Sequence, residues 1–262
     1  ALETAQLHLA TPPTGVVHAK WLDSGHQREL ASRTPDGVEL VVGLGGGRAL
    51  DASKYVALER EVPLILVPTI VSSGAIIHGH VGAWRGRRLH GAVDDWPWVD
   101  CEYVLVDYGV ALAAAPNLHT AGLGDILCGH AGPVESQWRG ENGYGPPLVP
   151  GLFEEFNRYH QGLVDSFRQT LDQQGNLTAG SIKQIMTALQ MRDSARPRSA
   201  GGKSGDHPFW IALELINDRT WIHGELVALG AVIIAWQCGG ELALLVERLE
   251  RCQVRFRPQE MD

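Results

Sequence analysis

The chain has 262 residues, 44% hydrophobic and 20% charged, which is enough for one large domain or two modest domains with a real core. Thirty acidic side chains against 22 basic ones leave a formal net charge of −8, so the basic face that nucleic acid requires is not expected. The longest apolar stretch, residues 226–236, is shorter than the roughly 18–20 residues of a membrane span. We therefore expect neither a nucleic acid nor a membrane as a partner.

The four cysteines, Cys101, Cys128, Cys238 and Cys252, form no C-x-x-C pair and are too sparse for a disulfide framework. The first residues contain no basic region followed by an apolar segment, so no secretion signal is expected. These features predict reduced thiols in a cytoplasmic protein.

The composition changes near residue 118. Before it, residues 38–42, 63–67 and 103–106 are nearly continuous apolar runs, a pattern typical of parallel strands covered on both faces. A helical stretch over 48–59 joins the first two runs into a β–α–β unit. Beyond residue 118 the strand signal disappears. We predict an α/β domain over residues 1–118 and an all-α domain over residues 119–262.

The second part shows helical periodicity throughout. Apolar side chains recur every one to four residues from 152 to 171, which predicts a long amphipathic helix. Gly175-Asn176 ends this helix, and Asn176 or Thr178 is expected to cap the next one, which runs through 191. After a loop over 196–205 that is rich in glycine and proline, three further helices are predicted at 208–216, 222–238 and 241–252.

Residues 41–47 read Val-Val-Gly-Leu-Gly-Gly-Gly and lead from a strand into a helix. Such a turn presents backbone N–H groups at a helix N-terminus, where the helix dipole favours an anion such as a diphosphate. The same glycines also suit a tight turn without a ligand. Asp51 and Lys54 follow in the helix and either face such a ligand or form a surface i,i+3 pair.

A carboxylate and two histidines give a sharper signal. Asp125 is expected to open the first helix of the α-domain, while His207 and His223 lie 16 positions apart. On one helix these two would be too far apart to share a ligand, but a turn between them allows two antiparallel helices to bring the imidazoles together. A carboxylate with two imidazoles and open positions is typical of a catalytic metal site. The alternative is that the histidines are unrelated and that Asp125 is a helix cap.

Taken in order, these segments resemble the iron-containing alcohol dehydrogenase and dehydroquinate synthase superfamily, and within it most closely glycerol-1-phosphate dehydrogenase and glycerol dehydrogenase. The resemblance runs from about residue 40 to 235 and rests on the following residues: the glycine turn at 42–47, Asp51 and Lys54, Val67-Pro68-Thr69, Ala115-Pro116, Gly122 to Asp125, Ser204 to His207, and His223-Gly224-Glu225.

The resemblance implies a Rossmann-like N-terminal domain followed by a helical domain, here shortened at both ends relative to the family. It implies that Gly45, Gly46 and Gly47 hold the pyrophosphate of NAD or NADP with Asp51 and Lys54 beside it, and that Thr69 and Ser72 lie toward the nicotinamide. It also implies that Asp125, His207 and His223 bind a divalent metal, for which Zn²⁺ is expected and Fe²⁺ or Ni²⁺ would also fit.

Three positions depart from the family pattern. Gly74 stands where family dehydrogenases carry an aspartate that contacts the substrate hydroxyl, Ile211 replaces a second histidine, and Gln137-Trp138 replaces an acidic-Trp pair. His78 and His80 lie just after the altered loop, and we hypothesise that they carry protons in place of the aspartate, the alternative being exposed loop residues. The arginines over 85–88 are expected on a surface hairpin.

The resulting prediction is a metal-dependent, NAD(P)-linked oxidoreductase that interconverts a polyol or polyol phosphate and its ketone. One alternative is a dehydroquinate-synthase-like sugar-phosphate cyclase or lyase that uses the same metal cleft, and another is a non-catalytic scaffold. The expected partner is a small polyol or sugar phosphate, and a homo-oligomer is expected because shortened domains leave apolar surface for a second subunit.

Overall fold

The computed structural model describes residues 12–20, 23–85, 88–92, 99–194, 204–217, 219 and 221–261. The chain divides into two compact units, Ala1–Ala114 and Ala115–Asp262. This division falls at 114, whereas the composition of the sequence places the boundary at 118.

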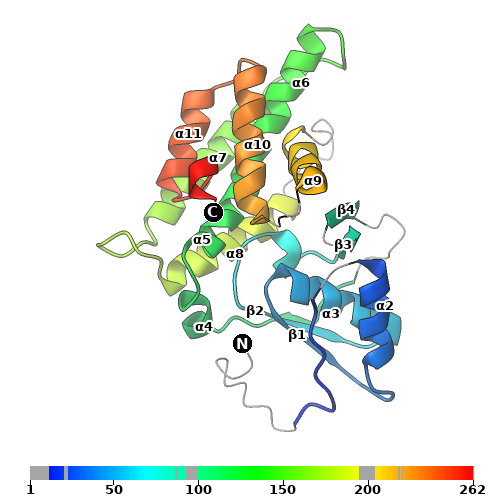
Figure 1. Cartoon of the computed structure of the whole chain (residues 1–262). Coiled ribbons are helices and arrows are strands. Elements are labelled where there is room, and N and C mark those ends of the chain that lie inside the picture. Colours follow the sequence, from blue (N-terminus) through cyan, green and yellow to red (C-terminus); the bar gives the residue numbers. More distant parts are fainter. Residues whose placement is uncertain are drawn as a thin grey trace. The chain divides into compact units, whose positions relative to one another are not determined.

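Unit 1 contains a three-stranded parallel sheet with the strand order β1-β2-β5 (Figure 1). The strands are β1 (Val41–Gly45), β2 (Leu64–Pro68) and β5 (Tyr103–Val104), and all three coincide with predicted apolar runs. The predicted helix is α3 (Gly47–Arg60), which connects β1 to β2. The predicted β–α–β unit is thus confirmed, with β1 starting three residues later than expected.

Two parts of unit 1 surround this β–α–β core. Helix α2 (Ser24–Arg33), which was not predicted, begins at an N-cap where Asp23 accepts a hydrogen bond from the backbone of His26. It buries Leu30 and Ala31 in a cluster with Ala52, Tyr55, Val56 and Val81. The expected hairpin is confirmed as β3 (Gly82–Arg85) paired with β4 (Arg88–Ala92), and Arg87 lies outside the described residues. Two short helices, η1 (Gly74–Ile76) and α4 (Tyr108–Leu112), complete the unit.

The regular elements that the structure describes in unit 2 are all helices. Its elements are α5 (Asn117–Leu127), η2 (Cys128–His130), α6 (Ala131–Glu141), α7 (Leu152–Arg168), α8 (Ala179–Ser194), α9 (Asp206–Ile216), α10 (His223–Gln237), α11 (Leu242–Arg251) and η3 (Pro258–Glu260). The predicted helices are confirmed within a few residues, and most of the loop predicted over 196–205 lies outside the described residues. Among the described helices, none has the length and apolar character that a bilayer span needs.

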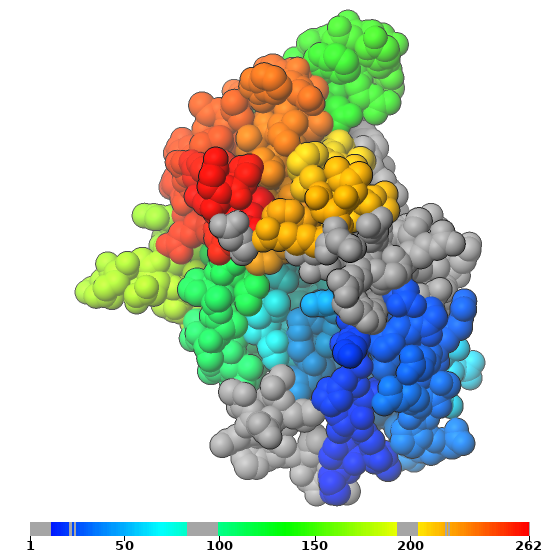
Figure 2. All heavy atoms as spheres, in the orientation of Figure 1, coloured from blue at the N-terminus to red at the C-terminus, as the bar shows by residue number. Residues whose placement is uncertain are grey.

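The turn between α7 and α8 projects from the body of unit 2 (Figures 1 and 2). Asp172 fixes it by accepting hydrogen bonds from the backbone N–H groups of Gln174 and Asn176, at 2.9 and 2.8 Å. Of the two predicted caps, Thr178 is the one that caps α8, because its hydroxyl accepts from the backbone of Ser181, whose own hydroxyl accepts from Thr178.

Helices α5 and α10 approach each other almost backbone to backbone. A Cβ on Gly224 would lie 1.8 Å from the carbonyl oxygen of Ala121, and a Cβ on Gly124 would lie 2.4 Å from that of Gly224. Only glycine fits at both positions, because no rotation of a side chain relieves a clash between a Cβ and backbone. This contact sets the spacing of the two helices that carry Asp125 and His223.

Replacing Gly224 with alanine should therefore push α10 away from α5 and lower the free energy of unfolding by about 2–4 kcal/mol. Gly132→Ala in α6 is the matched control, because nothing lies within 4 Å of its added Cβ, and it should raise stability by about 0.5–1 kcal/mol through helix propensity. Urea denaturation measures both changes, and equal effects of the two substitutions would contradict the proposed role of the contact.

Two histidines are enclosed in the core of unit 2. His130 and His160 are 2% and 1% exposed. Burial, reinforced by the positive charge of Arg248, lowers the pKa of His130 to about 4, and burial, His130 and Arg248 lower the pKa of His160 to about 3. Both imidazoles are therefore neutral in the folded protein at neutral pH.

This predicts a specific loss of stability in weak acid. Below about pH 6.5 the unfolded chain binds protons at these histidines while the folded chain does not, so the unfolding free energy should fall by up to about 2 kcal/mol per histidine between pH 6.5 and 5. Denaturation curves measured across this pH range should show that the unfolding free energy falls less steeply with decreasing pH in His160→Gln, whose side-chain amide replaces the imidazole as hydrogen-bond donor. An unchanged pH dependence of the unfolding free energy in that variant would contradict the lowered pKa of His160.

Candidate metal centre

Asp125 lies inside α5, eight residues after the helix begins at Asn117. The prediction that it opens this helix was wrong, and so is the alternative that it caps it, because Pro116 occupies the N-cap and starts the helix earlier. Its carboxylate is 3% exposed. A buried carboxylate requires compensating positive charge or a metal ion.

His207 and His223 reach Asp125 from two helices. Gly230 of α10 lies against Asp206 at the start of α9, whereas His223 lies against Trp210 farther along α9, so the two helices run in opposite directions, as predicted. The imidazole centroids of His207 and His223 are 5.3 Å apart. His223 Nε2 lies 3.2 Å from Asp125 Oδ1.

One potential ligand atom from each of Asp125, His207 and His223 lies within 4.8 Å of the other two. A carboxylate oxygen and two imidazole nitrogens are donors that Zn²⁺, Fe²⁺ and Ni²⁺ all accept. The imidazoles are partly exposed, by 35% for the side chain of His207 and 26% for that of His223, so the cluster is accessible from outside. The geometry and chemistry of these three residues fit a divalent metal with positions left for other ligands.

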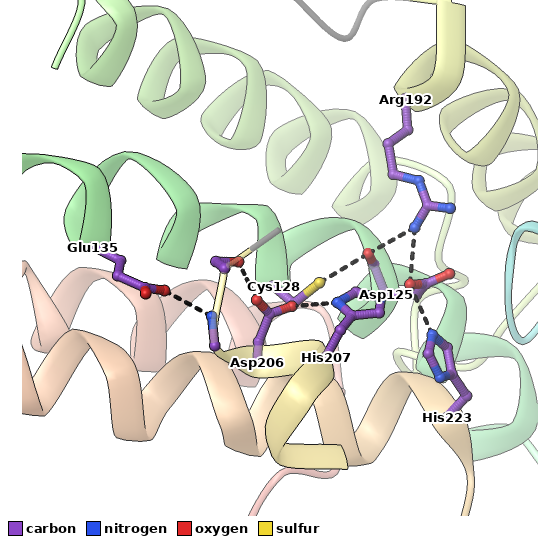
Figure 3. Close-up of polar contacts among 9 residues, drawn as sticks. Asp125, Cys128, Glu135, Arg192, Asp206, His207 and His223 are labelled. Atoms are coloured by element: carbon purple, nitrogen blue, oxygen red, sulfur yellow. Dashed lines mark hydrogen bonds and ion pairs between the residues drawn. The ribbon is translucent and has the colours of Figure 1, made fainter. Parts of the chain in front are cut away.

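Asp206 orients His207 within this cluster (Figure 3). Its Oδ2 lies 2.6 Å from His207 Nδ1, and its other oxygen accepts a hydrogen bond from the Ser204 hydroxyl. The preceding peptide is also held, because the Gly205 N–H donates to Glu135 at 2.7 Å. A carboxylate on Nδ1 keeps the proton on that nitrogen and leaves Nε2 available as a ligand, which is the usual arrangement behind a metal-binding histidine.

Cys128 lies next to this pair and forms a second compact group with Asp206 and His207. Its thiol donates to the carbonyl oxygen of Asp125 at 3.1 Å. Burial, and then the negative charges of Asp206 and Asp125, raise the pKa of the Cys128 thiol well above its usual value. A protonated thiol is a poor metal ligand, so Cys128 acts here as a hydrogen-bond donor.

Arg192 of α8 provides positive charge beside Asp125 (Figure 3). Its Nη1 lies 2.8 Å from Asp125 Oδ1 and 2.9 Å from the carbonyl oxygen of the same residue. Burial by itself raises the pKa of the Asp125 carboxyl, but the charges of Arg192, His223 and His207 outweigh burial and hold that pKa well below its usual value. Asp125 is therefore ionised at neutral pH.

The glycine turn at the start of α3, in unit 1, has the backbone geometry of an anion cradle. Gly45 has φ = +141°, a conformation that side chains strongly disfavour. A Cβ on Gly46 would lie 3.0 Å from Ile70, so this glycine also fits closely against the loop that follows β2. The first amides of α3 have no acceptor within the helix and point out of its N-terminus.

Asp51 and Lys54 form a buried i,i+3 ion pair rather than a surface one, with Lys54 Nζ 2.9 Å from Asp51 Oδ1. Lys54 is fully buried and also donates to the carbonyl oxygens of Ala75 and His80, at 2.6 and 3.2 Å. The pair ties α3 to the loop over residues 75–80. Contact of either residue with a cofactor stays a prediction.

The other predicted residues of unit 1 lie in that same loop region. The backbone N–H of Thr69 donates to Gly45 at 3.0 Å, which places Thr69 beside the glycine turn, and Ser72 is half-buried. His78 is half-buried and His80 is exposed, with their ring centroids 6.5 Å apart. Their predicted roles in cofactor binding and proton transfer are not tested by these positions.

Comparison with known proteins agrees with the fold. A family model described as iron-containing alcohol dehydrogenase matches residues 5–78. The chain is 26% identical over 224 residues to glycerol-1-phosphate dehydrogenase [NAD(P)+] of Methanothrix thermoacetophila, covering 81% of this chain and 58% of the relative. It is 30% identical over 219 residues to the enzyme of the same name from Pyrobaculum arsenaticum, covering 77% and 59%.

The chain is thus similar to the iron-containing alcohol dehydrogenases. Among solved structures, a probable glycerol dehydrogenase from Sinorhizobium meliloti 1021 superposes with a TM-score of 0.67 at 20% identity, covering 90% of this chain and 67% of that one. Glycerol dehydrogenase from Schizosaccharomyces pombe gives 0.65 at 19% identity, covering 91% and 62%. The predicted fold class is thus confirmed. The chain spans less than two thirds of the length of the curated relatives it matches.

Two groups in this centre were not identified from the sequence. Arg192 is 67 positions from Asp125, and only the packing of α5 against α8 brings them together. Asp206 precedes His207 directly, and neighbours in a helix ordinarily point apart. The first turn of α9 nevertheless allows Asp206 to contact the ring of His207. The signal in the sequence that could have indicated this contact is the acidic residue directly before a predicted metal ligand.

The role assigned to Asp206 predicts that Asp206→Asn weakens binding of a divalent metal by about 10–100-fold, because the amide no longer fixes the tautomer of His207. Competition for Zn²⁺ against a chelating dye measures this affinity. Asp36→Asn is the matched control, since Asp36 is exposed on unit 1. Unchanged Zn²⁺ affinity in the Asp206 variant would show that the carboxylate does not support the ligand.

Proposed function

We propose that this chain is a metal-dependent, NAD(P)-linked oxidoreductase that interconverts a polyol or polyol phosphate and its ketone. The observation that carries the proposal is the convergence of Asp125, His207 and His223 within 4.8 Å. The relationship to proteins named glycerol-1-phosphate dehydrogenase [NAD(P)+] supports the same chemistry.

In this proposal Asp125, His207 and His223 hold the metal, with Zn²⁺ expected and Fe²⁺ or Ni²⁺ also compatible. When bound, the metal supplies a Lewis acid that polarises the carbonyl or hydroxyl of the substrate. Asp206 keeps the His207 ring in position. The buried surroundings of Asp125 keep bulk water from competing for its carboxylate.

Gly45, Gly46 and Gly47 are proposed to receive the pyrophosphate of NAD or NADP. Their lack of side chains leaves the amides of the first turn of α3 open to an anion. Asp51 and Lys54 support this site from within, because their buried pair fixes α3 against the following loop. Thr69 and Ser72 are proposed to lie toward the nicotinamide.

His78 and His80 are proposed as proton carriers in place of the aspartate that is Gly74 here. An imidazole accepts and releases protons near neutral pH, which suits an alcohol–ketone interconversion. The replacement of that aspartate also favours a second candidate, a sugar-phosphate cyclase or lyase that regenerates its cofactor in every turnover. Net formation of NAD(P)H from a polyol distinguishes the two.

A homo-oligomer in the cytoplasm is the proposed state of the protein. The large apolar side chains of Ile216 and Trp236 are 76% and 70% exposed, and a second subunit would cover them. Light scattering of the purified chain tests the association.

The purified chain should contain about one equivalent of divalent metal. The variants His207→Ala and His223→Ala should lose this metal, because removal of a ligand weakens metal affinity by more than the roughly 10–100-fold expected for removal of an orienting partner. Elemental analysis and nicotinamide absorbance with polyol substrates provide two separate readouts. His18→Ala is the control, because His18 is exposed in unit 1. Less than about a tenth of an equivalent of metal in the unaltered chain would favour the non-catalytic scaffold.

A further inference from the structure

Asp125 and Arg192 form a close ion pair at the position where a metal ligand is expected. Arg192 Nη1 and His223 Nε2 lie 2.8 and 3.2 Å from the same oxygen, Asp125 Oδ1. The Arg192 side chain is 15% exposed and Asp125 is 3% exposed, so solvent screens their interaction weakly. The guanidinium therefore supplies the charge that this buried carboxylate requires.

A divalent cation bound by Asp125 would bring two further positive charges to the carboxylate that Arg192 already contacts. Two cations on one buried carboxylate repel each other strongly, since little water separates them. A histidine ligand is usually held by a neutral or negative acceptor, as His207 is by Asp206, whereas a carboxylate ligand is held by a hydrogen-bond donor, which can be neutral. Arg192 is a donor that carries a positive charge.

We propose that Arg192 is a counter-charge that takes the place of the metal beside Asp125 in the metal-free protein and thereby lowers the affinity of the centre for divalent metal. This inference rests on the proposed metal site. It assigns to Arg192 a function different from that of Asp206, because Arg192 competes with the metal for Asp125, whereas Asp206 supports the metal ligand His207.

Arg192 also stabilises the fold without metal. Its contact with the carbonyl oxygen of Asp125, at 2.9 Å, joins α8 to the end of α5. Without the guanidinium, the ionised carboxylate would be buried and poorly compensated, which is costly for the folded state. Metal binding would then restore the missing charge, so a neutral side chain at this position makes stability more dependent on metal.

The test measures Zn²⁺ affinity of the full chain, stripped of metal and titrated against a chelating dye. Arg192→Gln should bind Zn²⁺ about tenfold more tightly or better, because the competing charge is gone. Arg192→Lys retains the charge and should stay close to the unaltered chain. Arg158→Gln is the matched control, because Arg158 is an exposed arginine of α7.

Thermal unfolding provides a second readout that does not depend on activity. The metal-free Arg192→Gln variant should unfold at a lower temperature than the metal-free unaltered chain. Added Zn²⁺ should raise the unfolding temperature of the variant by more than it raises that of the unaltered chain. If the variant fails to fold without metal, added Zn²⁺ should restore the fold, and failure to restore it would overturn the proposal.

The outcomes separate this inference from the proposed function. Zn²⁺ binding by the unaltered chain with equal or weaker binding in Arg192→Gln would overturn the counter-charge role and leave the metal site intact. Absence of Zn²⁺ binding in both proteins would overturn the metal site and the inference with it. Binding in Arg192→Gln alone would support the inference most directly, since the charge would then suffice to exclude the metal.

Discussion

The candidate metal centre depends on the close approach of α5 and α10. The two glycines that permit this approach, Gly124 and Gly224, directly adjoin Asp125 and His223 in the chain. Because the backbones are in contact beside the functional side chains, a short carboxylate on one helix reaches an imidazole on the other. A wider spacing, of the kind that leucine-lined helices adopt, would separate these groups beyond hydrogen-bond distance.

The charges around this contact alternate. The Arg192 cation lies against the Asp125 anion, the imidazoles of His207 and His223 follow, and the Asp206 anion lies behind His207. Burial lowers the pKa of His207, yet the carboxylates of Asp206 and Asp125 outweigh it and raise that pKa. The two buried carboxylates, Asp125 and Asp206, thus each lie against a cationic or protonatable side chain, which is the condition under which buried carboxylates are tolerated inside a helical unit.

The sequence predicted the elements of this architecture more accurately than their junctions. Strands β1 and β2 and helices α7 to α11 follow from apolar runs and periodicity, which are local properties. The start of α5 at Asn117 was missed because no strong N-cap side chain marks it. The short 3-10 helix η2 was also not predicted. It precedes Pro133, which has no N–H to donate to the carbonyl oxygen of Gly129.

Site residues were predictable where spacing and residue type point to a shared ligand. Asp125, His207 and His223 could be grouped from the sequence, since a turn between two helices accounts for the separation of the histidines. Arg192 could not, because its position relative to Asp125 is a consequence of how α8 packs on α5. The sequence predicted a pair of Asp51 with Lys54 as one option. Its burial could not be predicted, because the loop over residues 75–80 is what covers the pair.

The departures from the family pattern change what the chain itself offers for proton transfer. Ile211 lies one helical turn after His207 on α9, so an apolar side chain occupies the place of an imidazole on that face. Gly74 offers only its backbone, and its carbonyl accepts from the N–H groups of Ile77 and His78. Lys54 fixes the same loop through Ala75 and His80. A proton carrier works only when it is held in place, so the proposed role of His78 and His80 requires the fixed loop that these contacts provide.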